Sequence, residues 1–214
     1  MREEPKKREK FKNIIGNHIV NNLTEYAIVI LMFFIGVILG IIFINNIKEE
    51  QSKELESYIN TFITSLKDGS SIDKVSLLMQ SLKNNIGLGI LLWFIGCTVI
   101  GVPIIYLLIA FRGFCLGYTI SAVIAIMGVG KGALFILSSM LLQNFFFIPC
   151  ILALGVSGMK LYKSIMKDKR KENIKLEIIR HTIFSVIMIM ILALSSVVEV
   201  YGSSNISQFT IKYL

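Results

Sequence analysis

Residues 26–44 read YAIVILMFFIGVILGIIFI, and none of these side chains carries a charge. At about 1.5 Å of rise per residue, a helix of this length reaches roughly 28 Å, which is enough to cross the hydrocarbon core of a bilayer. The segment is therefore predicted to be a transmembrane helix, and the rest of the fold has to be compatible with a membrane.

The composition of the whole chain agrees with that prediction. Of 214 residues, 54% are hydrophobic and 17% are charged, and the mean hydropathy is +0.71. This is too apolar for a single soluble core. The net charge of +8 lies in blocks between apolar runs, without the basic and aromatic platform on which bases stack. We therefore expect membrane lipids, and no nucleic acid, as partners of these charges.

Four more apolar runs follow the first one, at residues 86–110, 113–129, 132–154 and 183–200. They predict an all-α integral membrane bundle of about five transmembrane helices, with residues 26–214 forming one polytopic domain behind a basic segment, 1–25. Most of the 22 Lys and Arg residues lie in that segment and in a basic loop at 160–182. Because positive residues favour the inside, the N-terminus is predicted to be cytoplasmic and the C-terminus external.

The longest predicted external segment, residues 45–85, is patterned as two helices. Apolar side chains recur at helical spacing, DGSS interrupts them, and a second apolar series leads into the next span. We expect an external helical hairpin between the first two spans. Its first apolar stripe either closes on itself or on the membrane surface, or docks another protein; the candidate partner-binding residues are Leu55, Ile59, Phe62 and Leu66.

Two pairs of glycines have the spacing that lets helix backbones approach closely. The pairs are Gly36 with Gly40 and Gly113 with Gly117. Such small-residue pairs indicate either helix packing inside the bundle or association with a second copy of the chain. A homo-oligomer therefore remains possible at this stage.

Two carboxamides, Gln143 and Asn144, lie inside the apolar run LLQNFFFIP at 141–149, one turn after Ser139. An unpaired amide in hydrocarbon costs several kcal/mol, so we expect partners on neighbouring helices or in a wet cavity. Pro149 removes a backbone donor and is predicted to kink the helix near the amides. The pair is interpreted either as glue between helices or as a substrate site of a transporter.

Three charged residues accompany the spans. Arg112 is predicted to lie in a very short loop between the second and third spans, as a cytoplasmic anchor. Glu199 lies near the outer end of the fifth span, either as an interfacial acid or paired with Lys131. Lys131 itself belongs to GVGKG at 128–132, which indicates a tight turn because it lacks the full order of a phosphate-binding loop.

No combination of residues in the sequence indicates catalysis, a metal or a cofactor. A nucleophile with its base, a metal cluster or a poised carboxylate pair would be needed. The three cysteines are interpreted as packing thiols. His18 and His181 precede apolar runs and are interpreted as interfacial residues. We therefore predict that the protein is not an enzyme.

Residues 112–162 resemble the stage II sporulation protein M family. RGFCLGY at 112–118, the glycine and lysine turn at 128–132 and QNFFFIP at 143–149 occur in the order of that family's motifs. The basic N-terminus, the long first external loop and Glu199 also fit. Leu142 is a departure, since the family pattern leads us to expect proline before the Gln-Asn pair.

The resemblance implies a non-enzymatic scaffold in the mother-cell septal or engulfing membrane. Members of the family act with the wall hydrolases, stage II sporulation proteins D and P, during septal wall thinning, membrane migration and forespore engulfment. The resemblance thus implies recruitment or stabilisation of peptidoglycan hydrolases at the septum. The alternatives are a transporter or permease subunit with a polar site at Gln143 and Asn144, and an intramembrane enzyme.

Overall fold

The computed structural model describes residues 20, 22–67, 73–98, 100–167 and 174–203. All the regular structure in these ranges is helical. The elements are, in chain order, α2 (Leu23–Asn45), α3 (Glu49–Lys67), α4 (Lys74–Gly96), α5 (Gly101–Met127), α6 (Val129–Ser139), α7 (Leu141–Lys167), α8 (Ile174–Val197) and the π-helical turn η1 (Val198–Ser203).

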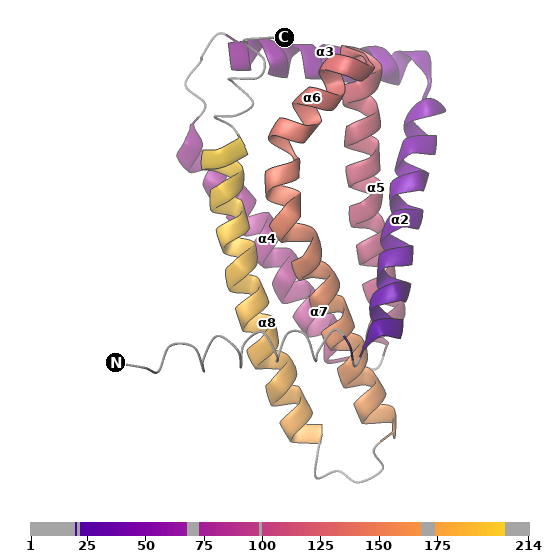
Figure 1. Cartoon of the computed structure of the whole chain (residues 1–214), viewed down its shortest axis with the longest axis vertical. Coiled ribbons are helices and arrows are strands. Elements are labelled where there is room, and N and C mark those ends of the chain that lie inside the picture. The colour runs from indigo at the N-terminus through magenta and orange to yellow at the C-terminus, as the bar shows by residue number, and fades with distance from the viewer. Residues whose placement is uncertain (1–19, 21, 68–72, 99, 168–173, 204–214) are drawn as a thin grey trace.

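The helices run up and down between two ends of one bundle (Figure 1). α2 rises to the end where α3 lies across the bundle, α4 returns, and α5 rises again beside α2. α6 and α7 then descend, and α8 rises to finish at η1. We call the two ends the α3 end and the α7–α8 end. The predicted helical membrane bundle is confirmed.

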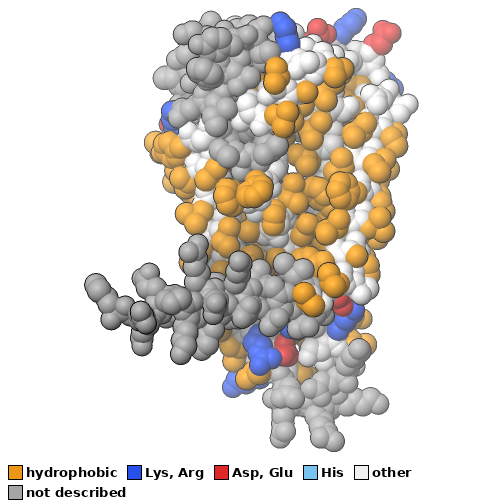
Figure 2. Space-filling view, in the orientation of Figure 1, with side chains coloured by type: hydrophobic (Ala, Val, Ile, Leu, Met, Phe, Trp, Pro, Cys, Tyr) orange, Lys and Arg blue, Asp and Glu red, His pale blue; other side chains and the backbone are white. Residues whose placement is uncertain are grey.

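Four helical segments are long and apolar enough to cross a membrane: Leu23–Asn45, Gly101–Met127, Asn144–Met166 and Ile174–Gly202. The segment in α7 is 61% buried inside the protein, whereas each of the others is 28% buried, so α7 is the central helix. Apolar side chains cover the middle of the visible face, with charges at its two ends (Figure 2). The remaining pass, α4, has a polar first half that includes Lys83, Asn84 and Asn85.

The second and third spans predicted at 86–110 and 113–129 are wrong. The chain turns at residues 97–100, and α5 then continues without interruption through position 112. Gly96 ends α4, Gly101 begins α5, and Pro103 lies in the first helical turn, where a missing backbone donor is tolerated. Because this turn carries no charged residue, the hydropathy of 86–110 reads as one continuous span.

The predicted fourth span, residues 132–154, is divided between two helices. Gly128, with φ of 80°, makes the turn between α5 and α6, a backbone conformation that favours glycine. A second break falls at Met140, between α6 and α7, while α7 runs through Pro149. The predicted interruption near the amides is therefore present, but it does not lie at the proline.

α3 rests on the bundle through its apolar side. Leu55 and Ile59 are half-buried, and Ile59 and Ile63 pack against the small core of Val123 and Phe135. The side chains of Phe62 and Leu66, and the DGSS segment, lie outside the described part of the chain. The second predicted arm of the hairpin is α4, which enters the bundle itself (Figure 1).

Candidate functional site

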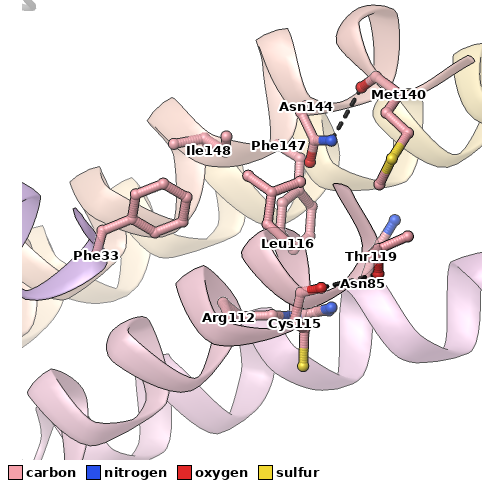
Figure 3. Close-up of a pocket in the computed structure, with 10 residues that line it drawn as sticks. All are labelled: Phe33, Asn85, Arg112, Cys115, Leu116, Thr119, Met140, Asn144, Phe147 and Ile148. Atoms are coloured by element: carbon pink, nitrogen blue, oxygen red, sulfur yellow. Dashed lines mark hydrogen bonds between the residues drawn. The ribbon is translucent and has the colours of Figure 1, made fainter. Parts of the chain in front are cut away.

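A cavity of about 160 Å³ lies where α2, α4, α5 and α7 meet (Figure 3). Six of the ten lining residues are apolar, and four polar side chains from three helices complete the wall: Asn85 from α4, Arg112 and Thr119 from α5, and Asn144 from α7. The full lining is Phe33, Asn85, Arg112, Cys115, Leu116, Thr119, Met140, Asn144, Phe147 and Ile148. A polar cavity inside a membrane bundle is a candidate functional site.

Arg112 is the charged residue of this cavity. The prediction that it lies in a cytoplasmic loop is wrong, because α5 carries it through the middle of the bundle. Its Cζ lies 4.7 Å from the centroid of the Phe147 ring, a cation–π contact between α5 and α7. Among the described residues, no hydrogen-bond acceptor of its guanidinium is found, so the aromatic face is its main direct contact.

Asn85 connects the cavity to a chain of polar contacts between α4 and α8. Its side chain is 4% exposed, and its Nδ2 donates to Ser196 Oγ at 2.8 Å and to Ser81 Oγ at 3.3 Å. Ser81 Oγ in turn donates to Glu199 Oε2. Buried amides and hydroxyls of this kind are stable in a membrane interior only when paired, as they are here.

Glu199 thus lies in η1, at the end of a partly buried hydrogen-bond chain. The prediction placed it near the outer end of the last span, and η1 directly follows α8. The charge of Glu199 also acts on Arg112. Lys131 is exposed on α6, and its pairing with Glu199 stays a prediction. Arg112, Asn144 and Glu199, which the sequence places in three separate segments, are therefore brought to one region of the bundle.

The side chain of Asn144 binds the backbone at the junction of α6 and α7. Its Nδ2 donates to the carbonyl oxygen of Met140 at 2.9 Å (Figure 3), and the same oxygen accepts the backbone N–H of Asn144 at 3.1 Å. The amide thus adds a second hydrogen bond to this carbonyl, and it lies on the cavity wall. The side chains of its neighbours Ser139 and Gln143 lie outside the described part of the structure, so their predicted roles stay predictions.

Asn85 and Ser81 were not singled out from the sequence. Their signal is the four-residue spacing, which puts both on one face of α4, together with the same kind of polar stripe at Ser196 and Glu199. Each stripe alone resembles an ordinary polar helix end. Only the contact between α4 and α8 makes them one cluster.

A second buried polar cluster joins α4, α7 and α8 nearer the α7–α8 end. His181 is 3% exposed; its Nδ1 lies 2.8 Å from Ser157 Oγ and its Nε2 lies 3.3 Å from the Trp93 carbonyl oxygen. The interpretation of His181 as interfacial is therefore wrong. A Cβ added at Gly96 would lie 2.9 Å from the Cα of Gly158 and 2.9 Å from His181 Nε2, so the absence of a side chain there makes room for the ring. His18 lies outside the described residues.

The thiols and the possible metal ligands remain dispersed. Cys97 and Cys115 are half-buried, Cys150 is buried, and all three are free. Within the described ranges, no three His, Cys, Asp or Glu side chains gather in a way that would hold a metal ion.

The fold and this interior define the class of the protein: a polytopic helical membrane protein with polar contacts buried among its helices. The family model for stage II sporulation protein M matches residues 29–204, which is most of the chain. The chain therefore belongs to the stage II sporulation protein M family and is a sporulation-related membrane protein. Comparisons with curated proteins and with solved structures give no match.

Proposed function

We propose that this protein is a non-enzymatic membrane scaffold that recruits or stabilises peptidoglycan hydrolases at the sporulation septum. In this role it serves septal wall thinning, membrane migration and forespore engulfment, with stage II sporulation proteins D and P as its partners. Family membership supports the assignment to sporulation. The position of α3 outside the candidate spans is the structural observation that carries the scaffold role.

α3 offers a surface that membrane helices cannot offer. Its inner side is held by Ile59 and Ile63 on the Val123 and Phe135 core. Its outer side presents Glu54 and Tyr58, the latter 74% exposed. Because the apolar stripe predicted for docking contributes to packing on the bundle, the outward face of α3 is the better docking surface. We name the face that carries Gln51, Glu54, Tyr58 and Thr61 the α3 outer face.

The orientation of the bundle decides on which side of the membrane the α3 outer face lies. The ion pair between Lys163 and Glu25 joins the start of α2 to the last part of α7, at the same end as the predicted basic loop. If that end is cytoplasmic, as the distribution of positive residues predicts, α3 lies on the side of the membrane where the peptidoglycan is. A helix fixed on the bundle there would hold a hydrolase at a set height above the membrane.

The proposal is tested by crosslinking and pull-down from sporulating cells. The intact chain is compared with a Glu54→Lys, Tyr58→Ala variant and with a control, Lys175→Glu, Leu176→Ala, which alters exposed residues at the α7–α8 end. At equal membrane levels, the intact chain and the control are expected to recover wall hydrolases, and the α3 variant to recover at least tenfold less.

Recovery of hydrolases at the same level by the α3 variant would remove the α3 outer face as the docking surface. Failure of the intact chain to recover any hydrolase would contradict the scaffold function itself. In that case, flux of solute through vesicles that contain the purified protein becomes the next measurement, since it is what a transporter requires.

A further inference from the structure

The guanidinium of Arg112 has more hydrogen-bond donors than the described residues satisfy. Arginine stays protonated and carries five N–H donors. Its contact with the Phe147 ring stabilises the positive charge but does not supply the lone pairs that in-plane N–H groups need. Because an arginine inside a membrane is costly unless it is paired, the donors that reach the cavity require acceptors in that cavity.

The neighbouring amides line the same cavity. Asn85 uses its Nδ2 for Ser81 and Ser196, so its Oδ1 is its remaining hydrogen-bonding atom. Asn144 uses one N–H for the Met140 carbonyl oxygen, and its Nδ2 carries a second N–H. Because the positive charge of this wall belongs to Arg112, a group rich in acceptors and carrying negative charge fits it better than a neutral or cationic group.

Glu199 limits the site without filling it. Its carboxylate accepts a hydrogen bond from Ser81, and its charge acts on Arg112. Its negative charge therefore lowers the cost of placing the positive charge of Arg112 inside the bundle. The same negative charge repels an anionic ligand in the cavity, so removing it is expected to strengthen the binding of that ligand.

The size and the opening of the cavity set the size of the ligand group. A cavity of about 160 Å³ is large enough for one carboxylate or phosphate group with water, because a single water needs only about 10–15 Å³ of cavity volume. Thr119, on the cavity wall, is exposed, so the cavity reaches the surface beside α5.

From these contacts we propose that the cavity around Arg112 binds an oxyanion, a carboxylate or a phosphate group, with Arg112 as its charged anchor and Asn144 as a second donor. The group belongs either to a small solute anion or to a phospholipid that reaches in beside α5. The site is independent of the α3 outer face and of hydrolase recruitment.

Binding is measured with the purified full-length protein in micelles. Equilibrium dialysis uses labelled inorganic phosphate and labelled acetate at constant ionic strength, and native mass spectrometry uses phosphatidylglycerol. The variants are Arg112→Gln, Arg112→Lys and Glu199→Gln, with Arg180→Gln as the matched control, because Arg180 is exposed and paired with Glu177 at the α7–α8 end.

Arg112→Gln is expected to weaken the binding of whichever of the three probes the intact protein binds by at least tenfold. Arg112→Lys is expected to weaken it less, since lysine keeps the charge but loses the planar donor fork. Glu199→Gln is expected to strengthen binding several-fold, and Arg180→Gln to leave it unchanged. Binding of phosphate or acetate identifies a solute anion; binding of phosphatidylglycerol alone identifies a lipid.

The proposal is overturned if none of the three probes binds, or if binding is the same in the intact protein and in Arg112→Gln. Where Arg112→Gln does not fold, Asn144→Asp replaces it, with folding checked by circular dichroism. That change puts a negative charge on the cavity wall and is expected to weaken anion binding at least tenfold. Unchanged binding in a folded Asn144→Asp protein also overturns the proposal.

Discussion

The α2–α5 contact and the α4–α8 contact hold the same bundle together by opposite means. α2 and α5 pack closely because glycines without side chains lie between them. A Cβ added at Gly36 would overlap the carbonyl oxygen of Ala110, and one added at Gly113 would overlap that of Phe33. Between α4 and α8, polar side chains are present: Asn85 and Ser81 join Ser196 and Glu199. One contact depends on shape, and the other depends on complete hydrogen bonding.

The difference explains which contact a sequence reveals. Both halves of the glycine contact carry their own local spacing, so each half can be found without the other. The polar contact consists of residues that look unremarkable until two distant helices are placed side by side.

The largest expected effect is at the glycine contact. Gly36→Ala adds a single methyl group where the α5 backbone already lies, so the helices must separate. We expect the free energy of unfolding to fall by about 3 kcal/mol, measured by SDS titration in mixed micelles. Gly87→Ala is the matched control, since a Cβ there meets nothing within 4 Å; it should be neutral or slightly stabilising. Equal effects would contradict close packing of α2 on α5.

The next effect is at the polar contact. Asn85→Ala removes the donor to Ser196 and Ser81 and leaves the polar groups of α8 and η1 without it. We expect a loss of about 1–2 kcal/mol in the same titration, in the range of hydrogen bonds between membrane helices. The neighbouring Asn84 is exposed, and Asn84→Ala should cost little. A larger loss of stability for Asn84→Ala than for Asn85→Ala would contradict the packing described here, because it would mean that the face of α4 that carries Asn84 contacts α8.

A smaller effect is expected at the histidine cluster. Ser157→Ala removes the partner of His181 Nδ1 and should cost about 1 kcal/mol. Ser185 is the control: its Oγ is buried and has no hydrogen-bond partner among the described residues, so Ser185→Ala should be neutral or stabilising. Thermal unfolding of both variants tests this, and a destabilised Ser185→Ala would mean that its hydroxyl has a partner.

The smallest effect is at the surface ion pair. Lys163 is 53% exposed where it meets Glu25, so solvent screens the pair. A double-mutant cycle with Glu25→Gln and Lys163→Gln should give a coupling below about 1 kcal/mol that falls further at high salt. Coupling that is larger and independent of salt would show that this end of α2 is more enclosed than its exposure indicates.

The fold class, the glycine contacts and the turn at Gly128 could be predicted from local signals, because length, spacing and turn chemistry lie within a few consecutive residues. The turn at 97–100 could not, because it has no charge and the apolar run continues across it. Arg112 was placed in a loop because single positive residues between apolar runs usually anchor loops. The bundle instead accommodates it beside Phe147 and near Glu199.

The polar interior was the least predictable part for the same physical reason. Its members come from α4, α5, α7 and η1. In its own sequence segment, each of them looks like an ordinary loop, helix-end or interfacial residue. Asn144 was recognised because an amide in an apolar run is conspicuous, whereas Asn85 lies in a stretch that already contains polar residues.

Cysteine accessibility tests the central structural claim, that the chain turns at 97–100 and that position 112 lies in the middle of α5, within the bundle. In a background that lacks Cys97, Cys115 and Cys150, Ile100→Cys and Arg112→Cys are treated with a bulky membrane-impermeant maleimide from each side of the membrane. The exposed turn position, Ile100, should be labelled from one side, and position 112 from neither. Labelling of position 112 with protection of position 100 would restore the loop at Arg112 and contradict the bundle described above.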